Sequence, residues 1–327
     1  MATSQRKISD TQNSERPLAI CLLGPTAAGK TALAIELVKR FPCEIVNVDS
    51  AQIYRDMNIG TGKPDSATLV LAPHRLLDFL DPSEAYSASR FRSDALREMA
   101  DIHNNGRIPL LVGGTMLYFK ALRDGLAVMP AADPAIRQQI SELAQAKGWA
   151  HVHAQLQQVD PESALRIHPN DPQRLQRALE IFLHSGRSMT QWHRESNAHP
   201  LSAGNPFALH FVSIQPHSRS VLHDRIAARF KQMLDDGLVQ EVQRLRARGD
   251  LDLSMPSMRA VGYRQVWQYI AGELSFDAMV EQGIIATRQL AKRQMTWLRS
   301  WDNLHDFDSE NPETLELVLK FVDQIAI

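Results

Sequence analysis

The segment GPTAAGKT at residues 24–31 has glycine at its first and sixth positions, followed by lysine and threonine. It follows the apolar run at residues 18–23 and leads into residues 31–41, where apolar side chains recur at helical spacing without a breaker. A strand, a glycine loop and a helix in this order form a phosphate-binding loop, because glycine allows close approach of the backbone and the helix N-terminus attracts an anion. The segment therefore predicts an α/β protein with a site for a diphosphate or triphosphate.

Each part of this loop has an expected role in binding phosphate. The backbone N–H groups turn toward the anion, Lys30 reaches the outer phosphate, and Thr31 binds a magnesium ion. The alternative is a purely structural turn, which the strand before the loop and the helix after it disfavour. The expected binding loop consists of Gly24, Pro25, Thr26, Ala27, Ala28, Gly29, Lys30 and Thr31.

Strands and helices continue to alternate after the loop, which predicts a P-loop NTPase-like core with a parallel sheet flanked by helices. Strands are expected at residues 44–48, 108–112 and 209–214, and a helix at residues 91–102. Ligands of such sheets lie beyond the carboxyl ends of the strands. Asp49 and residues 113–115 should therefore face the phosphate.

Asp49 has two ordinary functions at such a position. It can hold magnesium through water, as in phosphate-hydrolysing enzymes, or it can take a proton from a nucleophile as a general base. Ser50 and Gln52 stand beside it, and the amide of Gln52 offers the donor and acceptor that pair with an adenine edge. Gln52 is otherwise a polar loop residue, and the residues alone leave both alternatives open.

The chain divides into segments that differ in amino-acid composition and in their pattern of apolar residues. Residues 1–16 are polar and are expected to form a disordered tail. Residues 131–203 are polar, rich in glutamine and without strand signals, which predicts a mostly helical insertion. Residues 17–130 and 204–327 then form the catalytic core, in which residues 219–301 are expected to be helical.

Composition limits the classes of protein that need consideration. The net charge of −1 gives no overall attraction to nucleic acid, so any such binding must be local. The sequence has neither a long apolar stretch nor an apolar N-terminal signal, so we expect a cytoplasmic protein without a membrane partner. Its two cysteines, Cys21 and Cys43, lie in apolar runs and are expected to be buried thiols.

Eight segments together resemble bacterial tRNA dimethylallyltransferases. They are GPTAAGKT, VDSAQIY, NIGTGKP, APHRLLD, LLVGGTMLYFKAL, NDPQRLQRALE, RAVGYR and KRQMTWLR, in this order over nearly the whole chain after residue 17. The resemblance implies transfer of a dimethylallyl group from dimethylallyl diphosphate to the exocyclic N6 amine of adenosine-37, next to the anticodon, with release of diphosphate. It also implies Mg²⁺ as cofactor, the tRNA anticodon stem-loop as partner and a monomer with no obligate protein partner.

The resemblance also implies roles for individual residues. Asp49 would be the general base, Arg229 would contact the diphosphate together with Lys30 and Thr31, and Thr26 and Thr115 would contact substrate. By spacing alone, Arg225 and Arg229 could equally lie on a solvated helix face.

A larger set is expected to contact tRNA. By spacing alone, the arginines near residue 174 and the cationic stripe Arg288, Lys292 and Arg299 fit solvated helix faces, and Trp297 fits core packing better than base stacking. The resemblance favours RNA contact. The expected tRNA-binding residues are Asp49, Ser50, Ala51, Gln52, Thr115, Arg137, Gln173, Arg174, Leu175, Gln176, Arg177, Arg259, Ala260, Val261, Gly262, Tyr263, Arg264, Lys292, Arg293, Gln294, Met295, Thr296, Trp297, Leu298 and Arg299.

Three other classes share part of the pattern. An isopentenyltransferase acting on free adenine nucleotides would have the same loop and aspartate, but it needs no helical insertion with dispersed arginines. A small-molecule kinase would bind ATP in the loop, with residues 131–203 as its lid. A noncatalytic RNA-binding protein would have no use for the loop, the magnesium ligand and the base together.

Overall fold

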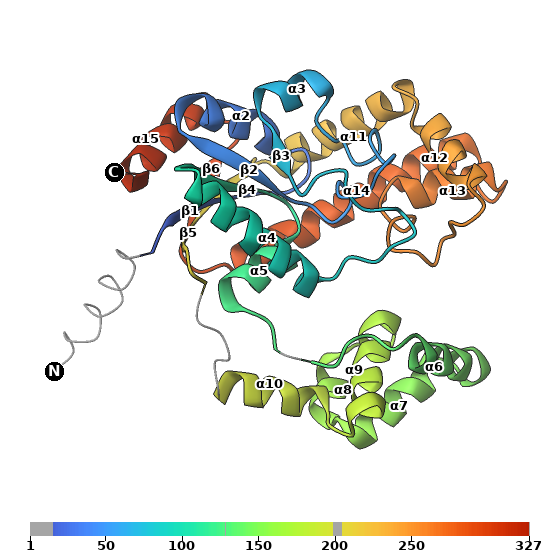
Figure 1. Ribbon diagram of the computed structural model, residues 1–327. Coiled ribbons are helices and arrows are strands. Elements are labelled where there is room, and N and C mark those ends of the chain that lie inside the picture. Colours follow the sequence, from blue (N-terminus) through green and yellow to red (C-terminus); the bar gives the residue numbers. More distant parts are fainter. Residues whose placement is uncertain (1–15, 128, 199–204, 327) are drawn as a thin grey trace. The chain divides into compact units, whose positions relative to one another are not determined.

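The computed structural model describes residues 16–127, 129–198 and 205–326 (Figure 1). The chain divides into two compact units, one formed by residues 1–124 and 205–327 and the other by Gly125–Gly204. The expected tail lies outside the described residues except for Arg16, whose Nη1 donates to the carbonyl oxygen of Asn205 at 3.3 Å. None of the described helices is both long enough and apolar enough to cross a membrane.

The first unit contains one parallel sheet with the strand order β3-β2-β4-β1-β5-β6. Its strands are β1 (Leu18–Leu23), β2 (Cys43–Val48), β3 (His74–Arg75), β4 (Ile108–Gly113), β5 (Ala208–Gln215) and β6 (Leu304–Asp308). Gly113 pairs in register with both Leu23 and Val48, so β1, β2 and β4 end together. The parallel α/β fold expected from the sequence is confirmed.

Two of the strands were not expected from the sequence, and both lie at the edges of the sheet. The strand β3 has only two residues, which is too short for a periodic pattern. The strand β6 reads LHDFD, and its polar residues are tolerated because an edge strand is only partly buried. The four strands between them carry the apolar runs that the sequence indicated.

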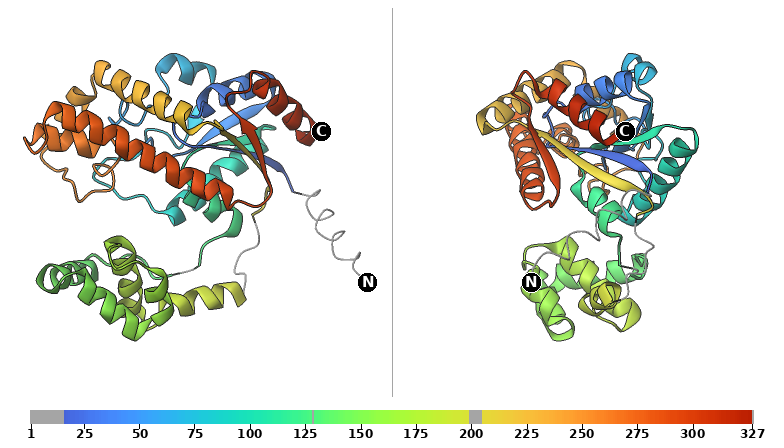
Figure 2. Two further views of the ribbon diagram at one scale, coloured as in Figure 1. Left: turned by 180° about the vertical axis from the view of Figure 1, so that it is seen from behind. Right: turned by 90° about the vertical axis from the view of Figure 1, so that its left-hand side faces the viewer.

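Helices cover both faces of the sheet (Figures 1 and 2). The helices of this unit are α2 (Lys30–Arg40), α3 (Ser66–Leu71), α4 (Ala88–Asn104), α5 (Met116–Asp124), α11 (Arg219–Asp235), α12 (Leu238–Ala247), α13 (Tyr263–Ile270), α14 (Phe276–Arg299) and α15 (Thr314–Ala326). The side chains of Ile20 and Leu22 pack with α2 and α15, whereas Ala19, Cys21 and Leu23 pack with α4 and α5. Burial on both faces is typical of a parallel strand and explains the uninterrupted apolar run of β1.

A separate apolar cluster lies among α11, α12, α13 and α14 and the segment that follows β2. It includes Tyr54 and Met57 from that segment, Phe230 from α11 and Tyr263 from α13, and all four are buried. Both cysteines are buried and unpaired, as the sequence indicated. This cluster packs the segment after β2 against α11, α12, α13 and α14. Part of that segment forms a wall of the cavity described below.

The described residues of the second unit form helices and their connections, without a strand. Its helices are α6 (Pro134–Lys147), α7 (Trp149–Val159), α8 (Pro161–Arg166), α9 (Pro172–Ser185) and α10 (Met189–Ala198). Three of them begin at an Asp-Pro pair in which Asp133, Asp160 or Asp171 accepts a backbone N–H of the first turn. The unit extends beyond residues 131–203 on its N-terminal side.

A buried carboxylate joins α6 to α9 within this unit. Glu180 is fully buried and accepts hydrogen bonds from Arg137 at 2.8 Å, from Arg177 at 2.7 Å and from the N–H of Asp133 at 2.8 Å. Burial tends to raise the pKa of Glu180, but the hydrogen bonds from the two arginines bring it below its ordinary value. The carboxylate is therefore charged and holds the two guanidinium groups in place.

We expect Glu180→Gln to lower the free energy of unfolding by about 1–3 kcal/mol, because the amide leaves buried hydrogen bonds unmade. Urea denaturation followed by circular dichroism measures the change. Glu142→Gln is the matched control on α6, since Glu142 is exposed and accepts only one side-chain hydrogen bond, from Gln138. Its effect should stay within about 0.5 kcal/mol. Equal losses in the two variants would contradict the role given to Glu180.

Candidate active site

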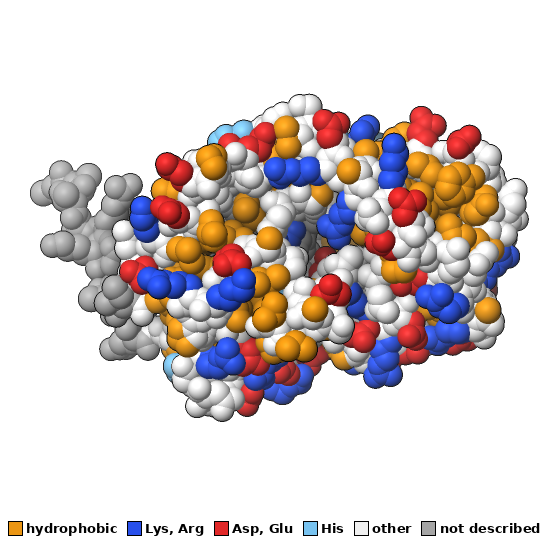
Figure 3. Space-filling model, turned by 90° about the horizontal axis from the view of Figure 1, so that it is seen from above, with side chains coloured by type: hydrophobic (Ala, Val, Ile, Leu, Met, Phe, Trp, Pro, Cys, Tyr) orange, Lys and Arg blue, Asp and Glu red, His pale blue; other side chains and the backbone are white. Residues whose placement is uncertain are grey.

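A cavity of about 490 Å³ lies at the carboxyl edge of the sheet. Its walls come from the loop 24–31, the segment after β2, residues 60–62, the helices α11 and α14, and residues 260–262. All of these belong to the first unit. The space-filling view from above shows a hollow near the middle of this face, with Lys or Arg side chains at its rim (Figure 3).

Two positions of the loop 24–31 require glycine, Gly24 because a neighbouring backbone lies close and Gly29 because of its backbone conformation. A Cβ atom on Gly24 would lie 2.3 Å from the carbonyl oxygen of Ile214. Gly29 has a φ of 96°, in the left-handed region that favours glycine, and the helix α2 begins at the next residue. The first N–H groups of a helix have no acceptor inside it, and the first three residues of α2, Lys30, Thr31 and Ala32, line the cavity. This is the geometry of a phosphate-binding loop.

Gln294 of α14 connects this loop to the end of β4. Its Oε1 accepts the N–H of Thr26 at 2.9 Å, and its Nε2 donates to the carbonyl oxygen of Gly114 at 2.9 Å. The side chain is buried, so both ends of the amide are used inside the protein. Gln294 is thus a structural link between the loop, the end of β4 and α14, and its expected contact with tRNA stays a prediction.

Lys30 lies in the cavity, where its Nζ donates to the carbonyl oxygens of Gly24 at 2.9 Å and Pro25 at 2.8 Å. Burial lowers the pKa of Lys30 to about 8, while the charge of Asp49 acts to raise it and that of Arg229 to lower it further. An anion bound in the cavity would favour the charged ammonium group. Binding of such an anion is therefore coupled to protonation of Lys30.

Asp49 lies in the same cavity, directly after β2. Its Oδ1 accepts the N–H groups of Ala51 at 2.8 Å and Gln52 at 3.3 Å, which fixes the orientation of the carboxylate. Beside it, Thr115 after β4 accepts the N–H of Ser50 at 3.0 Å. The ends of β2 and β4 are thus joined, and Asp49 is held near Lys30 and Arg229.

Arg229 of α11 is the second cation of the cavity. Burial lowers its pKa, and the charge of Asp49 partly opposes this effect. Its guanidinium group packs against Gly62, where a Cβ atom would lie only 2.0 Å from Nη2. Arg225, one turn earlier, also lines the cavity and donates to the hydroxyl of Ser309 at 3.0 Å. Both arginines therefore share the face of α11 that meets the cavity.

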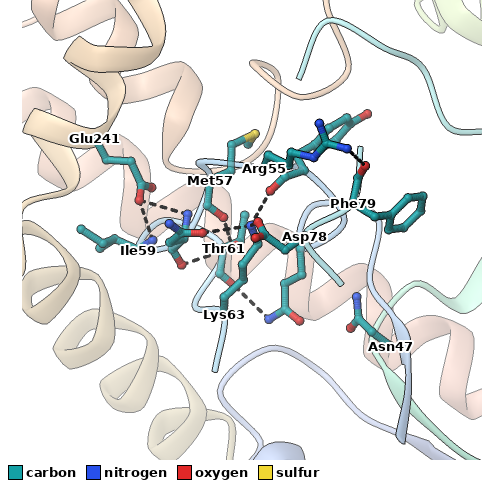
Figure 4. A network of polar contacts seen from close by, with 12 residues as sticks. Asn47, Arg55, Met57, Ile59, Thr61, Lys63, Asp78, Phe79 and Glu241 are labelled. Carbon is teal, nitrogen blue, oxygen red and sulfur yellow. Dashed lines mark hydrogen bonds and ion pairs between the residues drawn. The ribbon is translucent and has the colours of Figure 1, made fainter. Parts of the chain in front are cut away.

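Residues 60–62 form a wall of this cavity that sequence reasoning did not identify as such. Nε2 of Gln52 donates to the carbonyl oxygens of Thr61 at 3.2 Å and Gly62 at 3.1 Å. In this structure the amide NH₂ of Gln52 therefore binds this segment, which matches the polar-loop alternative, and pairing of Gln52 with an adenine edge stays a prediction. Figure 4 shows the network around this segment, including Lys63 and Asp78. The two glycines of NIGTGKP were the signal in the sequence that could have indicated a close backbone approach.

The residues expected to contact tRNA fall into two groups by exposure. Leu175, Gly262, Tyr263 and Leu298 are buried, because each belongs to the apolar face of its helix or to a tight turn against the core. The side chains of Leu175, Tyr263 and Leu298 pack inside the protein, so in this structure they do not face solvent, and a tRNA contact by these four residues stays a prediction. Gln294, described above, is also buried. The exposed or partly exposed members are Asp49, Ser50, Ala51, Gln52, Thr115, Arg137, Gln173, Arg174, Gln176, Arg177, Arg259, Ala260, Val261, Arg264, Lys292, Arg293, Met295, Thr296, Trp297 and Arg299.

Several of these exposed residues already have partners. Arg137 and Arg177 are paired with Glu180, and Nε2 of Gln176 donates to the carbonyl oxygen of Arg137 at 3.0 Å. Trp297 is half-buried and packs against the core of the sheet, which is the structural one of its two expected roles. The side chains available for a phosphate backbone are therefore fewer than the full set.

A second cavity, of about 260 Å³, lies between α11 and α14. Arg288, Lys292 and Arg299, the stripe indicated by the sequence, line it together with Arg219. No Asp or Glu in the described part of the chain lines this cavity, and Nε of Arg288 is buried without a hydrogen-bond partner there. Clustered cations without counter-ions are typical of a surface that binds an anion.

Comparison with known proteins identifies the class to which this fold and cavity belong. The model of the IPP transferase family matches residues 52–301, and that of the isopentenyl transferase family matches residues 18–78. The chain belongs to the IPP transferase family.

Solved structures support this assignment. The full-length tRNA isopentenylpyrophosphate transferase of Bacillus halodurans is 32% identical over 94% of this chain and 96% of its own, with a TM-score of 0.69. The tRNA delta(2)-isopentenylpyrophosphate transferase of Staphylococcus epidermidis is 32% identical over 94% of this chain and 100% of its own, with a TM-score of 0.67. A eukaryotic dimethylallyltransferase acting on tRNA is 26% identical over 90% of this chain and 74% of its own, with a TM-score of 0.75.

The lowered pKa of Lys30 predicts how anion binding depends on pH. Only the protonated form attracts diphosphate, so affinity for magnesium diphosphate should fall as the pH rises above the Lys30 pKa of about 8, by up to about tenfold per pH unit. Lys30→Met removes the charge at every pH and is the control. Calorimetric titrations between about pH 7 and pH 9.5 should show the advantage of the wild type over this variant shrinking. An advantage that is constant across this range would contradict the assignment.

Proposed function

We propose that this chain transfers a dimethylallyl group from dimethylallyl diphosphate to the N6 amine of adenosine-37 in tRNA, giving N6-dimethylallyladenosine and diphosphate. One observation carries the proposal: a phosphate-binding loop and the cations Lys30 and Arg229 face Asp49, the one carboxylate among the described residues that line the cavity. Membership of the IPP transferase family supports the reaction class, and tRNA appears in the descriptions of the three solved relatives.

The cations act on the leaving group. When the allylic carbon–oxygen bond breaks, the bonding electron pair goes to the diphosphate, whose negative charge increases. Loop N–H groups, Lys30 and Arg229 stabilise this charge in a partly buried cavity, where electrostatic interactions are stronger than in water. Lys30 would exchange its bonds to Gly24 and Pro25 for the diphosphate oxygens.

Asp49 acts on the acceptor. The N6 amine forms the new carbon–nitrogen bond and must lose a proton, which the carboxylate takes as general base. Oδ1 is held by two backbone N–H groups, whereas Oδ2 has no hydrogen-bond partner among the described residues and is available for the proton. This division of the two oxygens favours the base over a purely structural carboxylate.

Magnesium fits the oxygen donors at the start of α2. Thr31 lines the cavity and carries a hydroxyl oxygen, and Mg²⁺ prefers oxygen ligands that include several waters and substrate phosphates. No group of three or more His, Cys, Asp or Glu within the described ranges could hold a metal by itself. The ion would therefore bind together with the diphosphate, where it would neutralise part of the leaving charge.

Each unit offers cations for the anticodon stem-loop. The second unit has Arg174, exposed at the start of α9, and the pair Arg137 and Arg177 held by Glu180. The first unit has Lys292 and Arg299 beside the second cavity. Arginine guanidinium groups bind phosphate in two-pronged fashion, and fixed ones lose less conformational entropy on binding.

The reaction is tested by incubating the protein with tRNA and labelled dimethylallyl diphosphate or, separately, labelled ATP. We expect label transfer from the allyl donor alone and only with tRNA as acceptor. Transfer from ATP would indicate a kinase, and transfer to free adenine nucleotides would indicate the other class of isopentenyltransferase; either result would overturn the proposal.

The role of Asp49 is separable from that of magnesium. Asp49→Asn keeps the size of the side chain and removes the proton acceptor, so single-turnover transfer at saturating donor and tRNA should fall by about 10²–10⁴. Lys30→Ala and Thr31→Ala should each cost about 10²–10³ through lost stabilisation of the leaving group. Recovery of the Asp49→Asn rate at high magnesium would assign Asp49 to the metal and contradict the general base.

The arginines are tested through the salt dependence of tRNA binding. Neutralising Arg174 and Arg177, or Lys292 and Arg299, should reduce the slope of log affinity against log salt by roughly 0.7–0.9 for each lost phosphate contact. Lys39→Gln is the control, because Lys39 is an exposed cation on α2 outside either cavity. Slopes equal to that of the control would place these cations on solvated faces.

A further inference from the structure

Glu241 of α12 is a buried carboxylate that has no part in the proposed chemistry. It is 2% exposed and accepts four hydrogen bonds. Oε2 accepts the N–H groups of Asn58 at 3.0 Å and Ile59 at 2.8 Å, and Oε1 accepts the N–H of Gly60 at 3.2 Å and the hydroxyl of Tyr263 at 2.5 Å. Figure 4 shows Glu241 directed at this turn. Burying a carboxylate is costly, and a full set of donors makes it tolerable here.

The turn bound by Glu241 is packed closely on its other sides. A Cβ atom on Gly60 would lie 2.5 Å from the ring of Tyr263 and 2.8 Å from the side chain of Leu238. The burial and the carboxylate raise the pKa of Tyr263, so its hydroxyl stays protonated and donates to Glu241. Glu241 thus connects α12, α13 and the segment 58–62 at one point.

The same segment touches the catalytic groups at its other end. Gly62 packs against the guanidinium of Arg229, and the carbonyl oxygens of Thr61 and Gly62 hold the side chain of Gln52. Arg229 forms no ion pair with any described residue, and its guanidinium group is in close contact with Gly62 of this segment, which restrains its position. A shift of the turn at residues 58–60 would therefore reach Arg229 through three residues of backbone.

We propose that Glu241 is a positioning residue for the transfer reaction. By binding three successive N–H groups it fixes the segment 58–62, and through Gly62 it keeps Arg229 aligned with the leaving diphosphate. The inference depends on the proposed function above. A carboxylate is needed because glutamine would turn an NH₂ group toward N–H donors that have no other acceptor.

The test compares Glu241→Gln and Tyr263→Phe with the wild type at saturating donor and tRNA. Misplacing a catalytic group by about 1 Å can cost about 10²-fold, so we expect kcat per folded molecule to fall about 10–100-fold in Glu241→Gln. Tyr263→Phe removes one donor of four, so a smaller fall of about 2–10-fold is expected, and this variant carries the test if the first does not fold. The tRNA dissociation constant should stay within about twofold in both.

Glu44→Gln is the matched control for lost stability. Glu44 is a partly buried carboxylate at the start of β2, away from the cavity, where it pairs with Arg75 and Arg107. The Glu44→Gln variant should have a lower melting temperature than the wild type but the same kcat per folded molecule. A merely structural Glu241 would behave in the same way as this control.

A double-mutant cycle decides whether Glu241 acts through Arg229. In an Arg229→Ala background, Glu241→Gln should lower kcat by less than about twofold, because the group that it positions is gone. The inference is overturned if the full loss persists in that background, or if both single variants keep wild-type kcat. Failure of the proposed function looks different, since the wild type itself would then transfer no dimethylallyl group.

Discussion

The site depends on backbone segments that meet without side chains between them at the carboxyl ends of the central strands. A Cβ atom on Gly113 would lie 2.0 Å from the carbonyl oxygen of Val48, and one on Gly24 would lie 2.3 Å from that of Ile214. These contacts bring the loop 24–31 and Asp49 to one cavity, and the amide of Gln294 then joins the loop to β4. The geometry of the catalytic groups follows from this packing.

Charge balance within the cavity explains why it should bind an anion. Lys30 and Arg229 repel each other, and burial lowers the pKa of both, while Asp49 opposes these effects for each. A diphosphate bound next to Lys30 and Arg229 adds negative charge and thereby balances the excess of positive charge in the cavity. Asp49 is the one acidic residue among the described residues that line the cavity, so in the proposed reaction the same three residues would serve the leaving group and the nucleophile.

The features that depend on neighbouring residues could be predicted from the sequence, and those that depend on distant ones could not. The strand β1, the glycine loop and α2 follow one another, and Asp49 is placed by the end of β2. Glu241 binds residues about 180 positions away, so no local pattern indicates it. The burial of Tyr263 and Leu175 was not expected from the sequence, because a motif contains both the residues that face a ligand and the apolar residues that pack behind them. The short edge strands lack the apolar alternation on which prediction depends.

The most direct test of the account is a crystal structure of the protein with magnesium and a non-reactive thio analogue of dimethylallyl diphosphate. We expect the diphosphate in the loop 24–31, with its oxygens within hydrogen-bond distance of Lys30 and Arg229 and its allyl carbon facing Asp49. Lys30 should have left the carbonyl oxygens of Gly24 and Pro25, which it contacts in the structure described above. A diphosphate bound elsewhere, or one that leaves Arg229 without contact, would contradict the account.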